Sequence, residues 1–185
     1  MKHTLVLASR SPRRIELLKT AGLTFNVRAS DIDETPPAEM PAKKVPAYLA
    51  KEKAKATTIA KKEMIIAADT IVVLNNTIFG KPKDMADAKR ILNNLSDNMH
   101  TVITGVCIMT TEKNITFSEQ TKVFFRKLTD AEIDHYIKKY KPFDKAGAYA
   151  IQEWIGLTGI YRIEGDYFNV MGLPMCRLIE EMNKF

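Results

Sequence analysis

The stretch Thr4-Leu5-Val6-Leu7-Ala8-Ser9-Arg10-Ser11-Pro12-Arg13-Arg14 decides how this chain begins to fold. Residues 4–8 are mostly apolar and predict a short strand. An amphipathic run follows, in which Ser11 suits the N-cap of a helix and Pro12 suits its first position. The stretch therefore predicts a strand, a tight turn and a helix N-terminus rich in hydroxyl and guanidinium groups.

This predicted helix N-terminus favours anions. Its free backbone N–H groups and the helix dipole attract negative charge. Arg13 and Arg14 add planar donors whose geometry matches phosphate oxygens. We therefore expect a substrate that carries phosphate.

Length and composition indicate an ordinary globular protein. The chain has 185 residues, of which 45% are hydrophobic and 27% charged, so we expect a single domain over residues 1–185. No run approaches the ~20 apolar residues needed to cross a bilayer. The apolar run near the N-terminus is too short for a signal peptide. These features predict a cytoplasmic protein without a membrane partner.

The net charge of +6 raises the question of nucleic-acid binding. The lysines, however, are scattered along a long helical stretch, and a solvated helix face explains most of them. These lysines are Lys43, Lys44, Lys51, Lys53, Lys55, Lys61 and Lys62. We therefore expect no nucleic acid as a primary partner. The cysteines and histidines form neither a CxxC nor an HxxxH spacing, which argues against zinc.

The rest of the chain alternates between strand-like and helix-like segments. This pattern predicts an α/β fold with a partly antiparallel sheet. Further strands are expected at residues 25–29, 64–74, 77–79, 101–110, 115–128, 148–152 and 158–163, and further helices at 46–61, 84–95, 130–139 and 174–183.

Asp69 is unusual because it interrupts the apolar segment 65–73. A carboxylate in a central strand is costly unless it is paired or faces a cleft. It is either a strand-end aspartate bonded to backbone, or a metal ligand or general base. Gly80-Lys81-Pro82 favours the second interpretation, because Gly80 permits close backbone approach and Lys81 can reach a phosphate.

Two further patterns are weaker. Asp31, Asp33 and Glu34 share one loop, where their oxygens could hold a hard cation such as Mg²⁺. Gln152 ends the predicted strand 148–152, and its amide could read a nucleobase edge through a donor and an acceptor. By themselves, an acidic loop and a surface glutamine are also common features without function.

Together the motifs resemble those of one family, the Maf nucleoside triphosphate pyrophosphatases. The resemblance covers residues 4–180. It is carried, in order, by Ala8-Ser9-x-Ser11-Pro12-Arg13-Arg14-x-x-Leu17-Leu18, Ala68-Asp69-Thr70-Ile71-Val72, Gly80-Lys81-Pro82, Asp144-Lys145-Ala146-Gly147-Ala148-Tyr149 and Gly172-Leu173-Pro174. It implies an elongated mixed sheet with flanking helices and two lobes around a central cleft, similar to inosine triphosphate pyrophosphatases.

The resemblance also implies a reaction and a set of roles. The bond between the α- and β-phosphates would be cleaved, with Asp69 as general base, Glu34 and Asp69 holding Mg²⁺ or Mn²⁺, and a homodimer as the assembly. Ser9, Arg13, Arg14, Lys53 and Lys81 occupy the phosphate-binding positions.

Three positions match the branch of the family that prefers dTTP and UTP. They are Arg13, Thr70 and Gln152. We expect modified pyrimidine nucleotides as further substrates. Two alternatives stay open: a purine-type pyrophosphatase with another base pocket, and a regulator that binds nucleotide or nucleic acid without hydrolysis. The carboxylates Glu34 and Asp69 argue against the regulator, because a pure phosphate binder does not need them.

Overall fold

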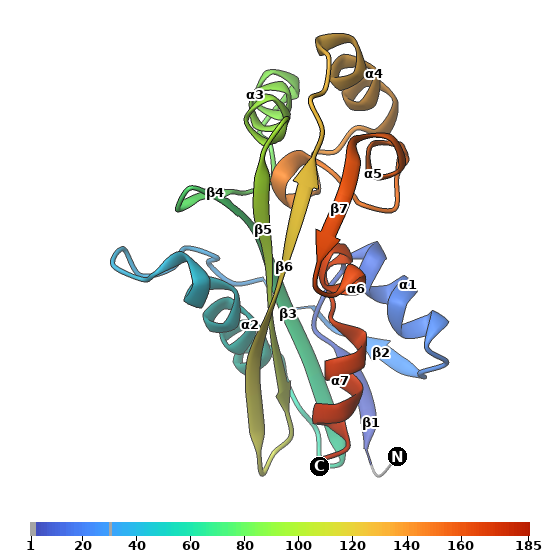
Figure 1. Ribbon diagram of the computed structural model, residues 1–185. Coiled ribbons are helices and arrows are strands. Elements are labelled where there is room, and N and C mark those ends of the chain that lie inside the picture. Colours follow the sequence, from blue (N-terminus) through green and yellow to red (C-terminus); the bar gives the residue numbers. More distant parts are fainter. Residues whose placement is uncertain (1–2, 30) are drawn as a thin grey trace. The chain divides into compact units, whose positions relative to one another are not determined.

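A computed structural model describes residues 3–29 and 31–185, so Met1, Lys2 and Ser30 of the predicted domain lie outside it. The fold is α/β with a seven-stranded mixed sheet in the order β2-β1-β3-β5-β6-β7, and β4 pairs with β3 (Figure 1). The predicted α/β class with a mixed sheet is therefore confirmed.

The strands are β1 (Thr4–Leu7), β2 (Phe25–Val27), β3 (Glu63–Leu74), β4 (Thr77–Phe79), β5 (Met99–Met109), β6 (Asn114–Phe125) and β7 (Ile160–Glu164). The helices are α1 (Pro12–Thr20), α2 (Val45–Ala56), α3 (Met85–Leu95), α4 (Asp130–Tyr140), α5 (Trp154–Gly159), α6 (Tyr167–Met171) and α7 (Met175–Met182), with short 3-10 turns η1 (Ala42–Lys44) and η2 (Ala146–Ala148).

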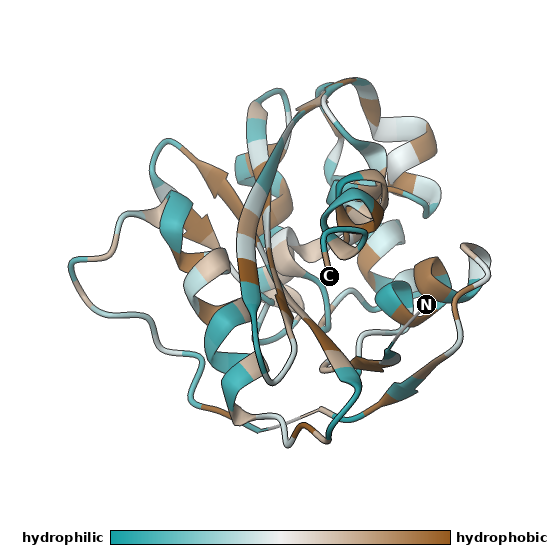
Figure 2. Ribbon diagram, turned by 90° about the horizontal axis from the view of Figure 1, so that it is seen from below, coloured by the Kyte–Doolittle hydropathy of each residue, from teal (hydrophilic) through white to brown (hydrophobic). Residues whose placement is uncertain are grey.

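The chain divides into two compact units. The first comprises the residues up to Thr70, residues 104–119 and the chain from Gly172 onward. The second comprises residues 71–103 and 120–171. Strands β3, β5 and β6 contribute residues to both units. Hydrophobic residues concentrate along the strands, whereas many connecting loops are hydrophilic (Figure 2).

In the first unit, helix α2 packs closely on the sheet. Ala50 and Ala54 of α2 share a buried cluster with residues of β1, β3 and β5, among them Val6, Ile65 and Cys107. Small side chains let the helix approach, and Gly105 of β5 lets it approach further: a Cβ atom there would lie 2.1 Å from the carbonyl carbon of Pro46. Any larger residue at 105 would push α2 outward.

In the second unit, the sheet carries a tight hairpin and a buried aromatic group. Asn75 and Asn76 join β3 to β4 with positive φ angles of 48° and 62°, which suit a two-residue hairpin turn. His100 stacks on Phe125 and meets Tyr149 edge-on, with centroid separations of 5.6 and 5.4 Å. Thr129 is the N-cap of helix α4 and forms a capping box with Glu132.

Three sequence predictions of local structure were wrong. Residues 148–152 are not a strand, because Gly147 and Ala148 have left-handed φ angles of 72° and 58° that break extended pairing. Helix α2 ends at Ala56 rather than at residue 61, because the β-branched pair Thr57-Thr58 follows Ala56 and disfavours further helix. Helices α5 and α6 were not predicted, because their short glycine-containing or turn-like sequences show no helical periodicity.

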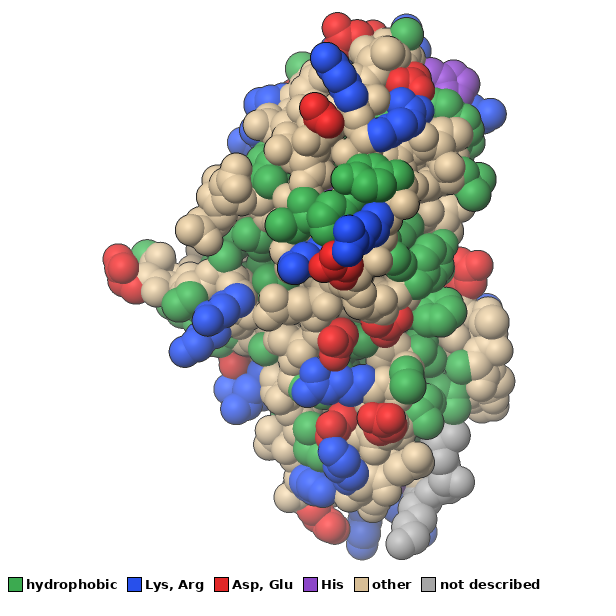
Figure 3. Space-filling model, in the orientation of Figure 1, with side chains coloured by type: hydrophobic (Ala, Val, Ile, Leu, Met, Phe, Trp, Pro, Cys, Tyr) green, Lys and Arg blue, Asp and Glu red, His purple; other side chains and the backbone are tan. Residues whose placement is uncertain are grey.

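Two surface properties bear on the predicted partners. Within residues 3–29 and 31–185, no helix is both long and apolar enough to cross a bilayer. Basic and acidic side chains are interspersed on the face in Figure 3. Several basic side chains of the protein pair with acidic ones, for example Lys89 with Asp134 at 2.8 Å and Lys122 with Glu164 at 3.2 Å.

Candidate active site

The central feature of the first unit is an ammonium group between two carboxylates. The Lys53 Nζ lies 2.6 Å from Asp69 Oδ1 and 3.1 Å from Glu34 Oε1. The Lys53 and Asp69 side chains are each 11% exposed, whereas that of Glu34 is 53% exposed. Asp69 is therefore satisfied by a charged side chain, not by backbone alone, which favours the chemical interpretation of this residue.

Packing explains why Lys53 differs from its neighbours in the sequence. Lys53 follows Ala50 by three residues and precedes Ala54, so it belongs to the stripe of α2 that faces the sheet. The general prediction of a solvated lysine face is wrong for this residue. Lys51 and Lys55 of the same helix are half-exposed or exposed, as that prediction requires.

The three acids of the loop do not act as one cluster. Asp31 pairs with Arg10 at 3.3 Å, and Asp33 accepts a hydrogen bond from the backbone N–H of Thr35 at 2.9 Å. The Thr35 hydroxyl and N–H lower the pKa of Asp33. Glu34 instead pairs with Lys53. Among the residues that the structure describes, no three His, Cys, Asp or Glu side chains gather as a metal site.

Glu34 and Asp69 nevertheless fit a hard cation. Their oxygens converge on one positively charged atom, and carboxylate oxygens are the ligands that Mg²⁺ and Mn²⁺ prefer. Mg²⁺ commonly uses one or two carboxylates and completes its shell with water and substrate phosphates. The two carboxylates present therefore fit such a cation in number and chemistry.

Ser9 lies in the loop after β1 and is 9% exposed. Its Oγ accepts hydrogen bonds from the Ser11 N–H at 3.2 Å and from Arg14 Nη1 at 3.1 Å. These bonds use its lone pairs and leave its hydrogen to be donated to an anion. Ser11 occupies the predicted N-cap position, but its side chain makes no capping bond, so the first turn of α1 keeps backbone donors for another acceptor.

The two neighbouring arginines of α1 are both half-buried. Arg14 donates to four acceptors of the first unit, on Ser9, Ala68, Thr70 and Gly172. Burial lowers the pKa of the Arg14 guanidinium, and the nearby Asp69 carboxylate opposes that shift. Thr70 Oγ1 also lies 2.9 Å from Thr104 Oγ1 of β5. The first unit thus brings together Ser9, Arg13, Arg14, Glu34, Lys53, Asp69 and Thr70.

Lys81 and Gln152 belong to the second unit, and both are exposed. Lys81 follows Gly80, whose carbonyl accepts a hydrogen bond from the Gly147 N–H at 3.1 Å. Residue 147 must be glycine, because φ is +72° and a Cβ would lie 2.7 Å from a Val72 methyl. Two motifs that are distant in the sequence are therefore joined within one unit.

The segment before Gln152 is held by Lys145, which belongs to a motif quoted from the sequence, and by Tyr136 and Glu153, which sequence reasoning missed. The hydroxyl of Tyr136 donates to Glu153 and accepts from the Ala150 N–H at 3.1 Å. Lys145 bonds Asp144 at 2.8 Å and lies 3.5 Å from Glu153. The only available signal was the capping box of α4, which fixes where Tyr136 falls on its helix but not what it contacts.

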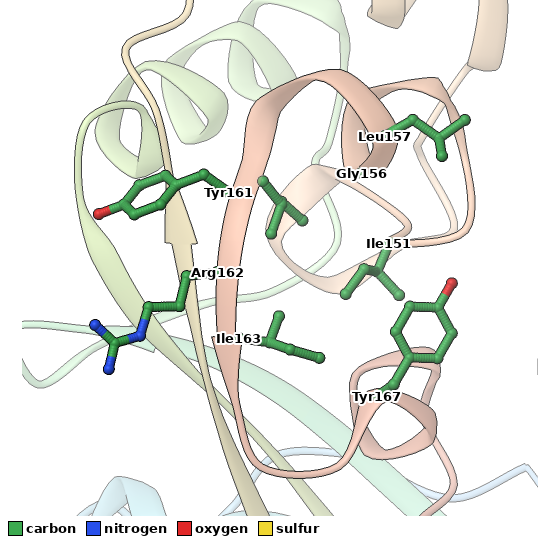
Figure 4. Close-up of a pocket in the computed structure, with 8 residues that line it drawn as sticks. Ile151, Gly156, Leu157, Tyr161, Arg162, Ile163 and Tyr167 are labelled. Carbon is green, nitrogen blue, oxygen red and sulfur yellow. The ribbon is translucent and has the colours of Figure 1, made fainter.

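The second unit also contains an open apolar groove of about 280 Å³ (Figure 4). Ile151, Ile163 and Tyr167 face one another across it, and Arg162 is its single charged lining residue (Figure 4). Among the described residues no carboxylate lines this groove, so these residues lack the groups that phosphoanhydride chemistry needs.

Comparison with known families agrees with these motifs. The profile of the family described as Maf-like protein matches residues 4–185. The chain belongs to the Maf family. This membership confirms the resemblance expected from the motifs, and the match extends from the first residue of β1 to the end of the chain.

Several curated relatives within the Maf family match nearly full length. A protein of Parabacteroides distasonis is 49% identical over 100% of this chain and 97% of its own length. One of Phocaeicola vulgatus is 50% identical over 99% of this chain and 96% of its own length. One of Thermosipho africanus is 49% identical over 94% of this chain and 89% of its own length. Each is named dTTP/UTP pyrophosphatase.

Proposed function

We propose that this protein is a nucleoside triphosphate pyrophosphatase that hydrolyses dTTP and UTP to the monophosphate and pyrophosphate. The observation that carries the proposal is Asp69, a carboxylate in a buried strand that lies 2.6 Å from Lys53 in the same unit as Ser9 and Arg13. The near-full-length relatives named dTTP/UTP pyrophosphatase support the choice of nucleotide. We extend the proposal to modified pyrimidine nucleotides.

Asp69 acts as the general base. Hydrolysis of a phosphoanhydride needs a positioned water and neutralised charge, and no covalent nucleophile. A carboxylate fixed by strand β3 and by the Lys53 ammonium has a defined orientation, so it can accept the proton of an attacking water. The base is thus built on a rigid element, where small displacements are resisted.

Cationic and hydroxyl groups neutralise the triphosphate. Ser9 donates its hydroxyl hydrogen, Arg13 presents a planar guanidinium, and the start of α1 supplies backbone N–H groups. Lys53 and Lys81 add point charges. Glu34 and Asp69 would hold a bound Mg²⁺ or Mn²⁺, which would supply charge neutralisation at the phosphates.

Base selection rests on Gln152, with Arg13 and Thr70. A primary amide offers an acceptor and two donors, which complement the O4 and N3–H edge of uracil and thymine. Guanine presents N1–H and N2–H₂ donors, which suit a carboxylate better. The observations that support Gln152 are its exposed side chain and the hydrogen bonds that fix Ala150, Lys145 and Glu153 around it.

A homodimer in the cytoplasm, with the nucleotide as its small-molecule partner, completes the proposal. Leu157 and Tyr161 are 84% and 68% exposed. Large hydrophobic side chains in water are unfavourable, and a second copy of the chain could cover them. Strand β7 ends the sheet, and its sequence Arg162-Ile163-Glu164 is self-complementary: antiparallel pairing about Ile163 sets Arg162 of one copy opposite Glu164 of the other. Light scattering of the purified protein should give twice 20.9 kDa, and Leu157→Glu should halve that mass.

A pyrophosphate-release panel tests the enzyme. Purified protein is incubated with UTP, dTTP, ITP and 7-methyl-GTP, with and without Mg²⁺, and Asp69→Asn serves as the matched control. The proposal expects release from UTP and dTTP that depends on metal. Preference for ITP or 7-methyl-GTP would instead support a purine-type enzyme, and nucleotide binding without release would support a regulator.

A further inference from the structure

The Arg14 guanidinium occupies an unusual place at the end of strand β1. Strands β1 and β3 run parallel from Thr4↔Glu63 to Leu7↔Ile66. The ladder continues with the Ala8 N–H, which donates to the Ile66 carbonyl at 2.8 Å. Two residues further along β3, the Ala68 carbonyl accepts instead from Arg14 Nη1 at 2.8 Å. A side chain thus replaces the strand neighbour where β1 has ended.

The same guanidinium fixes the residues around Ala68. Its Nη2 donates to Thr70 Oγ1 at 3.0 Å, and its Nη1 also donates to Ser9 Oγ at 3.1 Å. Ala68 and Thr70 flank Asp69 in β3, so Arg14 holds both neighbours of that carboxylate. On this edge of β3, β1 pairs up to Ile66 and β4 pairs with residues 72–74, so Arg14 bonds the stretch that lies between these two partners.

A fourth bond ties in the segment before α7. Arg14 Nε donates to the Gly172 carbonyl at 2.9 Å. Gly172 has a φ angle of +112°, which side-chain-bearing residues rarely adopt. This conformation gives the Gly172-Leu173-Pro174 motif a physical reason: it turns a carbonyl toward Arg14.

We propose that Arg14 is a positioning residue that substitutes for a strand neighbour and fixes Asp69 and Thr70, rather than a phosphate ligand. A guanidinium has five N–H donors, and four of them are directed to acceptors of the protein. Arg13, one residue earlier on α1, is left as the arginine that contacts phosphate. This inference rests on the proposed pyrophosphatase activity, because the residue that it positions is the proposed base.

The test compares Arg14→Lys with the matched variant Arg13→Lys. Lysine keeps the charge but cannot reproduce a planar fork of donors. For Arg14→Lys we expect kcat on dTTP and UTP to fall by at least roughly tenfold, because small misplacements of reacting groups are costly, while KM changes by less than about threefold. For Arg13→Lys we expect the reverse, a raised KM with a smaller change in kcat.

Hydrogen exchange provides a readout that does not depend on turnover. In Arg14→Lys, amide exchange should rise in the segments around Ser9, Ala68–Thr70 and Gly172 and stay unchanged in α3 and α4. A raised KM with unchanged exchange would overturn the proposal and return Arg14 to the phosphate. If wild type hydrolyses no nucleotide but exchange rises in these segments, the positioning role stands and the proposed function fails.

A second variant keeps the test decisive if Arg14→Lys does not fold. Gly172→Ala leaves every functional side chain in place but strains the backbone that presents the carbonyl to Arg14. It should lower kcat with little change in KM and raise exchange in the same three segments. Wild-type kcat and exchange in this variant would contradict the proposal.

Discussion

The two units hold their functional residues in different ways. In the first unit, charged groups fix one another: Lys53 bonds Asp69 and Glu34, and Arg14 bonds the residues that flank Asp69. In the second unit, the contacts act on the neighbours of the exposed Gln152 instead: Tyr136 bonds Glu153 and the Ala150 N–H, and Lys145 lies 3.5 Å from Glu153. The proposed roles divide only partly between the units: the proposed base Asp69 lies in the first and Gln152 in the second, whereas Arg13 and Thr70 of the first unit share the proposed base selection.

The largest expected effect lies in the first unit. Asp69→Asn keeps the shape of the side chain and removes the base, so kcat on every nucleotide should fall by roughly 10² to 10⁴. Circular dichroism should show an unchanged fold. Near-normal turnover of the purified variant would remove Asp69 from the mechanism, and a loss confined to one nucleotide would break the proposed division between the units.

The next effect lies in the second unit and should be selective. Gln152→Glu places a carboxylate where an amide would meet the pyrimidine edge, so discrimination in favour of UTP and dTTP over 7-methyl-GTP should fall by about 1–3 kcal/mol. The measurement is kcat/KM for the three nucleotides in wild type and variant. Arg13 and Thr70 share the selection, so the variant need not become a guanine enzyme. Unchanged ratios would show that Gln152 does not read the base.

A smaller effect is expected at the exposed carboxylate of the first unit. Glu34→Gln replaces a charged oxygen ligand by a neutral amide, so the Mg²⁺ or Mn²⁺ concentration for half-maximal activity should rise about tenfold. EDTA should abolish wild-type activity. Full activity in EDTA would mean that Glu34 and Asp69 serve structure rather than metal binding.

The smallest effect concerns the pH dependence of the free energy of unfolding, to which one residue of each unit contributes in a different pH range. Burial lowers the pKa of His100 in the second unit to about 3 from 6.5. In the first unit, hydrogen bonds from Arg28 and then from the Ala60 N–H lower the pKa of Glu63 to about 2 from 4.5. Both pKa values are lower in the folded state, so each contribution is complete above the unfolded value and is lost as pH falls through the folded one.

The His100 contribution therefore declines below pH 6.5, whereas the Glu63 contribution declines only below pH 4.5. Urea unfolding of wild type between pH 7.5 and 5 should show stability falling with acid by at most about 1.4 kcal/mol per pH unit. His100→Phe should flatten this slope, and Glu63→Gln should leave it unchanged. An equal slope in wild type and His100→Phe would contradict the burial of a neutral imidazole.

Sequence could predict residues whose chemistry is out of place. Asp69 stands out in an apolar strand, and the hydroxyl and arginine run after β1 marks the start of a helix. Lys53 was named only through the family resemblance, because its alanine neighbours and the scattered lysines look like a solvated face until α2 is packed on the sheet. The strand expected at 148–152 failed because the left-handed turn at Gly147 is set by its contact with Val72. The supports of Gln152 are tertiary contacts that no local pattern contains.

Gly105 has no functional group, yet it determines how close helix α2, which carries Lys53, can lie to β5. Helix α2 can contact β5 closely because Gly105 has no side chain. The Lys53 side chain starts from that helix, and its four methylene groups set how far its ammonium group can reach. A methyl group at 105 would lengthen the gap that these methylene groups have to span. A search for functional residues by their chemistry would overlook residue 105, although it affects the distance between the Lys53 ammonium group and the Asp69 carboxylate.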